Sequence, residues 1–137
     1  MTNIKWDKKY ETGTEDIDLQ HHYFLNLINT LVEAINKNES ELYLEALVAE
    51  LDAYAKFHFR SEERMMLHSN YPQYEVHKNH HFDLIQQLSV AQYKLTNPSK
   101  PEDAEAVIDF LLSWFIQHTT GEDRLLANYL QQYQNQQ

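Results

Sequence analysis

The stretch IDLQHHYFLNLINTLVEAIN (residues 17–36) repeats its inward-facing side chains at steps of four, three, four, three and four residues. The repeating positions are Ile17, His21, Phe24, Ile28, Leu31 and Ile35. This spacing places them along one face of an α-helix, which we expect over residues 17–37. One of the six is a histidine, so the apolar face of this helix also carries a metal-binding side chain.

Three further stretches repeat the helical pattern, and a short one follows near the end of the chain. We expect these helices over residues 40–69, 72–95, 102–120 and 122–133. Ser40 is a suitable N-cap for the second helix, because its hydroxyl can accept a hydrogen bond from a free amide of the first turn. Pro72 suits the first turn of the third helix, where its missing N–H has no bond to lose. The segment NPSKP (97–101) ends that helix, because a proline disfavours helical geometry in the residue before it.

Glycine and proline are scarce, and they fall where the helices are expected to end. The chain has two glycines and three prolines in 137 residues. Short connections make consecutive helices antiparallel neighbours. The sequence therefore predicts an all-α fold, an up-down-up-down four-helix bundle with an irregular N-terminal arm over residues 1–16 and a short C-terminal helix. The length corresponds to a single domain spanning residues 1–137.

The composition argues against several classes of function. Cysteine is absent, which removes disulfides, iron–sulfur clusters, thiolate zinc sites and cysteine nucleophiles. The net charge of −10 argues against nucleic acid and anionic membranes as partners, because both attract clustered lysine and arginine. We find no apolar signal-peptide core and no membrane span of about 20 apolar residues, so we expect a cytoplasmic protein. The sequence leaves any protein partner unknown.

Side chains that bind metals lie on the inward faces of the expected helices. They are His21, His58, Glu62, His77, His81, His118 and Asp123. Residues four apart lie one turn above each other in an α-helix, so His58 and Glu62 face the same way. The same holds for His77 and His81. Five imidazoles and two carboxylates suit borderline transition metals such as iron, and carboxylates can bridge two ions, so we expect a site for a pair of metals.

Asp123 can join this set only under one structural condition. It lies five residues beyond His118, which corresponds to about 140° around a regular helix. Gly121 lies between them, and a glycine costs about 1 kcal/mol in a helix interior. We therefore expect the helix to break near Gly121 and to turn Asp123 back towards the bundle axis.

A structural role without metal is the alternative for each of these residues. A lone histidine on an apolar face is more often a hydrogen-bonded core residue than a ligand. For seven residues together this alternative fails, because unpaired buried polar groups cost about 1–3 kcal/mol each against a total stability of about 5–15 kcal/mol. His22, His68 and His80 lie off the inward faces and are expected at the surface. Glu63 likewise points away from the core.

Four motifs, in this order along the chain, resemble those of the hemerythrin family, in particular its single-domain bacterial members. The motifs are WDKKYETG followed by IDLQH (6–21), HFRSEERMM (58–66), HKNHH (77–81) and WFIQHTTGED (114–123). The resemblance covers nearly all of the chain, and four motifs at bundle spacing are far more specific than one. It implies a non-haem di-iron centre, bridged by carboxylates and by an oxo or hydroxo group. Asp18 and Gln20 also match the family pattern, and we keep them outside the metal set as residues that could orient ligands or cap a helix.

Carried over residue by residue, the resemblance divides the seven side chains into two iron positions and two bridges. One iron would be held by His77, His81 and His118, the other by His21 and His58, and both by Glu62 and Asp123. The second iron would then have one protein ligand fewer, which leaves a position open to a small molecule. The walls expected around this position are Phe24, Leu25, Ile28, Trp114 and Phe115.

The function that the resemblance implies is reversible O2 binding, by an oxygen carrier, storage or delivery protein rather than an enzyme. Three alternatives stay open. A di-iron enzyme would reduce peroxide or nitric oxide, although ferritin-like oxidases carry more carboxylates, including Glu-x-x-His pairs that this chain lacks. An oxygen or redox sensor would act through a separate partner. A zinc-loaded bundle is compatible with the same ligand types, and metal analysis would distinguish it.

Overall fold

The chain folds into antiparallel helices. The computed structural model describes residues 3–96 and 101–135, and every regular element within these ranges is helical. The helices are α1 (Glu15–Asn36), α2 (Glu41–His68), α3 (Tyr74–Thr96), α4 (Pro101–Thr120) and α5 (Glu122–Asn135), with a single 3-10 turn, η1 (Lys8–Tyr10), in the N-terminal arm. This content confirms the predicted all-α class.

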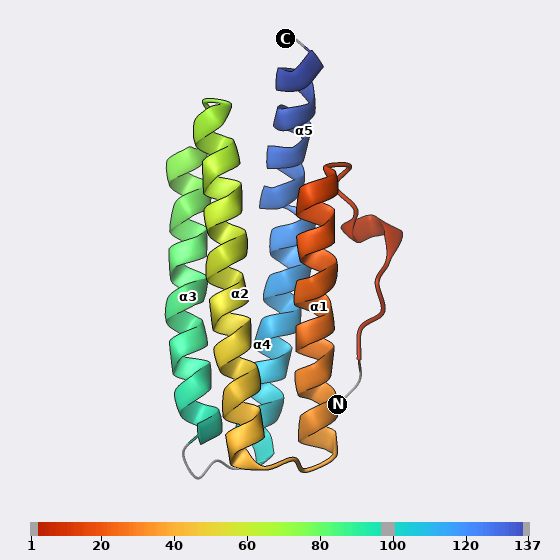
Figure 1. Ribbon diagram of the computed structural model, residues 1–137, viewed down its shortest axis with the longest axis vertical. Helices are drawn as coiled ribbons and strands as arrows, with labels where there is room; N and C mark the ends of the chain where they lie inside the picture. Colours follow the sequence, from red (N-terminus) through yellow and green to blue (C-terminus); the bar gives the residue numbers. More distant parts are fainter. Residues whose placement is uncertain (1–2, 97–100, 136–137) are drawn as a thin grey trace.

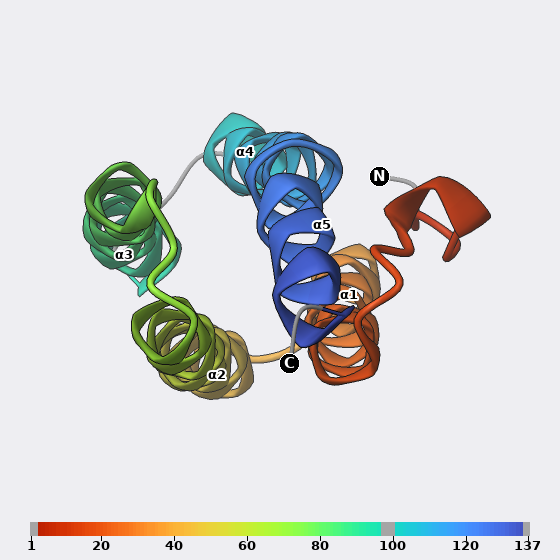
Figure 2. The same ribbon diagram turned by 90° about the horizontal axis from the view of Figure 1, so that it is seen from above.

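Helices α1 to α4 run alternately in opposite directions along one axis (Figure 1). Seen along that axis, they stand at the four corners of a bundle (Figure 2), and each helix contacts the next around the ring. Helix α5 continues from the end of α4 and leans across the bundle towards α1. The up-down-up-down arrangement is therefore confirmed.

Local hydrogen bonding and backbone geometry set where the second and third helices begin. The amide of Tyr43 donates to Ser40 Oγ at 3.2 Å, so Ser40 caps α2 as predicted. Helix α3 begins at Tyr74, two residues later than predicted. The reason is the turn before it, where Asn70 adopts a positive φ of 56° and the chain is still turning at Pro72. Pro72 therefore lies in the turn and not in the first helical turn.

The other predicted boundaries differ little from those observed. Helix α1 begins at Glu15 rather than at residue 17, and its first turn carries three acidic residues, which the positive end of the helix dipole favours. Helix α5 extends to Asn135, two residues beyond its predicted end. Residues 97–100, which make up most of the predicted NPSKP connection, lie outside the described residues.

Two apolar clusters fill the bundle, one on each side of a polar layer. The larger cluster occupies the half nearest the α1–α2 connection and includes Ile28, Leu31, Leu51, Leu88 and Ile108. The smaller cluster lies where α5 covers the other end and consists of Ile17, Met66, Tyr71, Leu126, Ala127 and Leu130. The predicted metal-binding residues lie between the two clusters. Among the described residues, no helix is long and apolar enough to cross a bilayer.

The contacts that fix the N-terminal arm to the bundle include one buried aromatic ring and one carboxylate. Tyr10 is 3% exposed and packs edge-on against Phe115, with ring centroids 5.6 Å apart. The carboxylate of Asp18 accepts hydrogen bonds from the amide and hydroxyl of Thr12 and from the amide of Gly13. Asp18 therefore ties the arm to the first turn of α1, but its partners precede the helix, so it does not cap the helix amides.

Candidate metal centre

The structure brings all seven predicted metal-binding side chains together. They come from five helices: His21 from α1, His58 and Glu62 from α2, His77 and His81 from α3, His118 from α4 and Asp123 from α5. Each is at most 4% exposed. The adjacent His22 lies at the surface, where its ring stacks on Trp6 of the arm.

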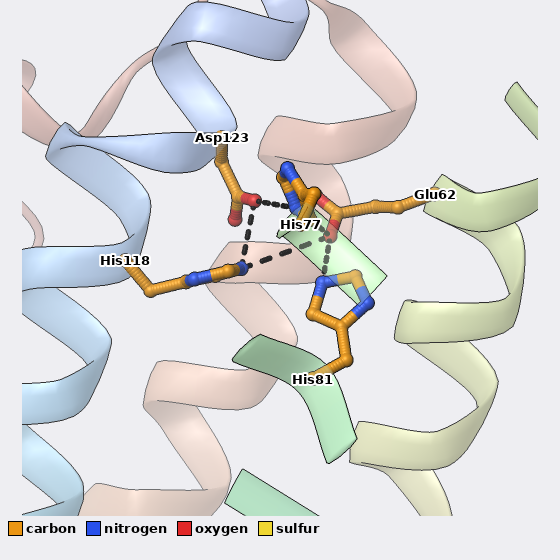
Figure 3. Close-up of side chains that lie close together, drawn as sticks. All are labelled: Glu62, His77, His81, His118 and Asp123. Atoms are coloured by element: carbon orange, nitrogen blue, oxygen red, sulfur yellow. Dashed lines mark hydrogen bonds and ion pairs between the residues drawn. The ribbon is translucent and has the colours of Figure 1, made fainter. Parts of the chain in front are cut away.

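Five of these residues form a first group, which we call the three-histidine group. Ligand-type atoms of Glu62, His77, His81, His118 and Asp123 all lie within 4.8 Å of one another. Figure 3 shows the three rings around the two carboxylates, each with a nitrogen directed inwards. His81 Nε2 is 2.9 Å from Glu62 Oε1. His118 Nε2 is 2.9 Å from Asp123 Oδ1. His77 Nε2 reaches both carboxylates, at 3.3 Å from Glu62 Oε1 and 3.0 Å from Asp123 Oδ1.

A second group, the two-histidine group, shares both carboxylates with the first. Ligand-type atoms of His21, His58, Glu62 and Asp123 lie within 4.8 Å of one another. His21 Nε2 is 2.7 Å from Asp123 Oδ2. His58 Nε2 is 3.5 Å from Glu62 Oε2 and 4.0 Å from Asp123 Oδ2.

The two oxygens of each shared carboxylate are divided between the groups. Oε1 of Glu62 and Oδ1 of Asp123 face the three-histidine group. Oε2 of Glu62 and Oδ2 of Asp123 face the two-histidine group. A carboxylate that presents one oxygen to each of two ligand groups has the arrangement of a bridge between two cations. The geometry therefore outlines two adjacent positions, one surrounded by five residues that could bind a metal and one by four.

Many of the converging atoms are close together without being hydrogen-bonded. The buried atoms that lack a hydrogen-bond partner among the described residues include Nε2 of His58, His81 and His118, Oε2 of Glu62 and Oδ1 of Asp123. Their contacts are short in distance, but they point into shared space rather than at one another. Such unpaired buried atoms cost about 1–3 kcal/mol each, and cations between them would satisfy the whole set. Imidazole nitrogens with carboxylate oxygens fit a borderline transition metal.

The expected helix interruption lies at Gly121 and gives Asp123 its place in the site. Helix α4 ends at Thr120, and α5 begins one residue after Gly121. The amide of Gly121 still donates to Gln117 O at 3.0 Å, and a Cβ added to Gly121 would lie only 2.7 Å from that oxygen. Glycine therefore permits the close backbone approach at which the helix changes direction. Asp123, in the first turn of α5, is then fully buried.

Comparison with known proteins identifies the family. A family model described as the Hemerythrin HHE cation binding domain matches residues 12–130, a range that contains all seven residues of the site. This chain belongs to the hemerythrin family. Its relatives include a Bacteriohemerythrin from Clostridium acetobutylicum, 25% identical over an alignment of 125 residues that covers 87% of this chain and 95% of the relative.

Other hemerythrin relatives cover a similar share of the chain. A Bacteriohemerythrin from Stenotrophomonas maltophilia is 26% identical over 136 residues, which are 99% of this chain and 87% of the relative. The Hemerythrin subunit alpha of Lingula anatina is 25% identical over 118 residues, which are 86% of this chain and 87% of that protein. The resemblance stated from the four motifs is therefore confirmed.

In the metal-free hemerythrin-type cluster, protons on histidines balance the negative charges of the two carboxylates. Burial lowers the pKa of His77, but the nearby carboxylates of Asp123 and Glu62 outweigh this effect and raise the pKa to about 9. Burial also lowers the pKa of His118, but the carboxylates, Asp123 above all, outweigh this effect and raise the pKa to about 10. Burial lowers the pKa of His81. Burial raises the pKa values of Glu62 and Asp123, but the surrounding histidines hold both well below their usual range.

These shifts predict how the stability of the metal-free protein depends on pH. Because the pKa values of His77 and His118 are raised above the ordinary 6.5, their contribution is complete below about pH 6.5 and is lost as the pH rises towards 9 and 10. The contribution of Glu62 and Asp123 is complete above their ordinary values of 4.5 and 3.8 and is lost on acidification. We therefore expect urea unfolding with a chelator present to show a lower midpoint at about pH 9 than at about pH 6. A midpoint that stays constant or rises over this range would contradict the ion pairing.

Three residues contact the predicted ligand histidines from outside, and only one of them, Gln20, was singled out from the sequence. Glu63, which was predicted to point away from the core, has Oε2 3.1 Å from His81 Nδ1, so its side chain reaches back to α3. Oε2 of Glu122 lies 3.6 Å from His118 Nδ1. Gln20, whose role the sequence left open, accepts a hydrogen bond from a ligand histidine of α2. Adjacency in sequence to Glu62 and Asp123 was the available signal for Glu63 and Glu122, whereas Gln20 also matched the family pattern.

Aromatic rings cover both histidine groups. The ring of Phe59, which was not among the predicted walls, stacks on His81 with centroids 3.9 Å apart. Trp114 stacks on His118 at 4.4 Å and so covers the three-histidine group, not the more open position for which it was predicted. Phe115 lies edge-on to His21 at 5.9 Å, on the side where a wall was expected.

Proposed function

We propose that this chain holds two iron ions in the buried cluster and binds O2 reversibly at the two-histidine position, as an oxygen carrier, storage or delivery protein. The observation that carries the proposal is the division of the carboxylate oxygens between two unequal histidine groups. Two cations can share Glu62 and Asp123, while the second has one histidine fewer. A position with fewer protein ligands is where a small molecule can enter.

The proposed ligand set follows the two groups. His77, His81 and His118 would hold one iron, His21 and His58 the other, and Glu62 and Asp123 both. When bound, the irons would supply an open coordination position and the electrons that reversible O2 binding requires. The protein's own contribution is to fix the donor atoms and to keep water away from them.

Exclusion of water around the two-histidine group supports binding over turnover. His21 and His58 are each only 3% exposed. The ring of Phe115 lies against His21. The ring of Phe24 stacks parallel to the ring of Phe115, with centroids 6.2 Å apart. Aromatic rings offer no acidic proton. A dry pocket without added acid disfavours the release of reduced oxygen and so favours return of O2.

Oxygen cycling tests the proposal directly. The iron-loaded protein is reduced without air, exposed to O2 and then purged with argon, while the visible spectrum is recorded. We expect the spectrum to change with O2 and to return on purging, over repeated cycles. A spectrum that does not return would overturn reversible binding. Metal analysis of protein isolated from native cells is expected to give two irons per chain, and zinc in their place would overturn the iron assignment.

We propose that catalysis is not the main role of this site, and turnover measurements test this. Two carboxylates among seven donors stabilise high-valent iron less than the carboxylate-rich sites of ferritin-like oxidases do. Steady-state reduction of peroxide or nitric oxide would establish an enzyme instead. A sensor would be established by a partner that binds with different affinity in the presence and absence of O2.

A further inference from the structure

We propose that Glu63 and Gln20 act as positioning residues that make the two metal positions unequal, so that the three-histidine position fills first and the two-histidine position empties first. This inference rests on the proposed function, because it requires two metals in the cluster. It concerns the ring nitrogens that face away from the centre. The groups bonded to these outer nitrogens fix each imidazole and set how strongly it donates to a metal.

On the three-histidine side, the outer nitrogens of His81 and His118 face carboxylates. His81 Nδ1 donates to Glu63 Oε2 at 3.1 Å, and its Nε2 faces the centre. A negatively charged acceptor draws positive charge onto the ring and makes Nε2 a stronger donor. His118 Nδ1 has a second carboxylate, Glu122, at 3.6 Å. Two of the three histidines are thus supported by negative charge.

On the two-histidine side, the outer support is neutral or lacking. His58 Nδ1 donates to the amide oxygen of Gln20 at 2.5 Å. An amide oxygen can only accept, so the proton of His58 stays on Nδ1 and the lone pair of Nε2 faces Glu62. Nδ1 of His21 is buried, and no hydrogen-bond partner for it occurs among the described residues. This side therefore has ring orientation from Gln20 but no added charge.

Gln20 is itself held in place by α2. Its Nε2 donates to Ser61 Oγ at 3.2 Å, which directs the amide oxygen at His58. Its backbone carbonyl accepts a hydrogen bond from the hydroxyl of Tyr54 at 3.1 Å. The side chain therefore connects the first ligand helix to the second at the two-histidine group. A residue fixed at both ends can orient a ligand rather than merely contact it.

The number of protein ligands and the charge next to the outer nitrogens both favour metal binding at the three-histidine position. The two-histidine position has four protein ligands instead of five, and its imidazoles are the weaker donors. Because the neutral Gln20 supports its histidine, the metal at this position can exchange a ligand at its open side. Glu63 and Glu122 hold the metal at the three-histidine position more firmly. The chain therefore builds the inequality of the two positions into residues outside the ligand set.

The test is an anaerobic titration of the metal-free protein with Co²⁺, whose visible absorption reports coordination. We expect two binding steps, and we expect His21→Gln to abolish only the weaker one. Gln20→Ala should weaken the weaker step by about 10–100-fold, and Gln20→Glu should restore or strengthen it, because a carboxylate also accepts from His58 Nδ1. Glu63→Gln should weaken the tighter step by about 10–100-fold.

Two matched controls separate these effects from general changes in charge or packing. Glu45→Gln removes an exposed carboxylate of α2, and Gln86→Ala truncates an exposed glutamine of α3, so both should leave both steps unchanged. Two equal steps in the unsubstituted protein would overturn the inference while leaving the proposed function intact. The same holds if Gln20→Ala and Glu63→Gln shift the same step. Absence of Co²⁺ binding altogether would overturn the proposed function itself.

Discussion

Replacement of Asp123 by asparagine is expected to reduce the metal content to at most one ion per chain, in place of the proposed two. Asp123 lies near histidines of both groups, through Oδ1 to His77 and His118 and through Oδ2 to His21. An asparagine keeps the shape but has one oxygen and no charge, so it cannot bridge two cations. The two-histidine position should lose its metal, because it already has the smaller ligand set.

The same change tests the metal-free protein. Removal of the Asp123 charge should bring the raised pKa values of His77 and His118 down, so these rings lose protons rather than remain charged and unpaired. We expect the free energy of unfolding with a chelator present to fall by about 1–3 kcal/mol, less than the 3–5 kcal/mol typical of a broken buried ion pair. Asp109→Asn, on the exposed face of α4, is the matched control. Two ions retained by Asp123→Asn with an unchanged spectrum would exclude Asp123 as a bridge.

Local periodicity was enough to predict which side chains turn inwards. The apolar steps of each helix are a property of a few neighbouring residues, so they distinguished buried His21 from exposed His22 without knowledge of any other helix. The break at Gly121 was also local, because five-residue spacing does not fit one face of a regular helix and the glycine marks where the helix can break.

How the inward side chains are grouped could not be predicted from periodicity. The rotation and height of each helix relative to its neighbours decide whether His58 meets His21 or His77, and side-chain packing between helices sets both. The division into two groups came from the resemblance to the hemerythrins. The outer contacts were harder still, because Glu63 lies off the inward face and reaches His81 only through its own flexible side chain.

Gly121→Ala is expected to destabilise the protein by about 1–3 kcal/mol, although the same change within a regular helix stabilises by about 0.5–1 kcal/mol. The added Cβ would lie 2.7 Å from the backbone oxygen of Gln117, a separation that real Cβ atoms do not show. Because that oxygen is backbone, no side-chain rotation relieves the clash, and the start of α5 must move. Asp123 lies two residues beyond and moves with it.

Urea unfolding and metal analysis together measure this effect. Besides the lower stability, we expect the bridged pair to be lost, because the Asp123 contacts of 2.7–3.0 Å tolerate little displacement. Ser113→Ala, at an exposed position of α4, adds helix propensity without a new contact and should leave metal content unchanged. If Gly121→Ala proved as stable as the unsubstituted protein and kept both metals, then α4 and α5 could join without the close approach at Gln117. The glycine would then not be what directs Asp123 into the site.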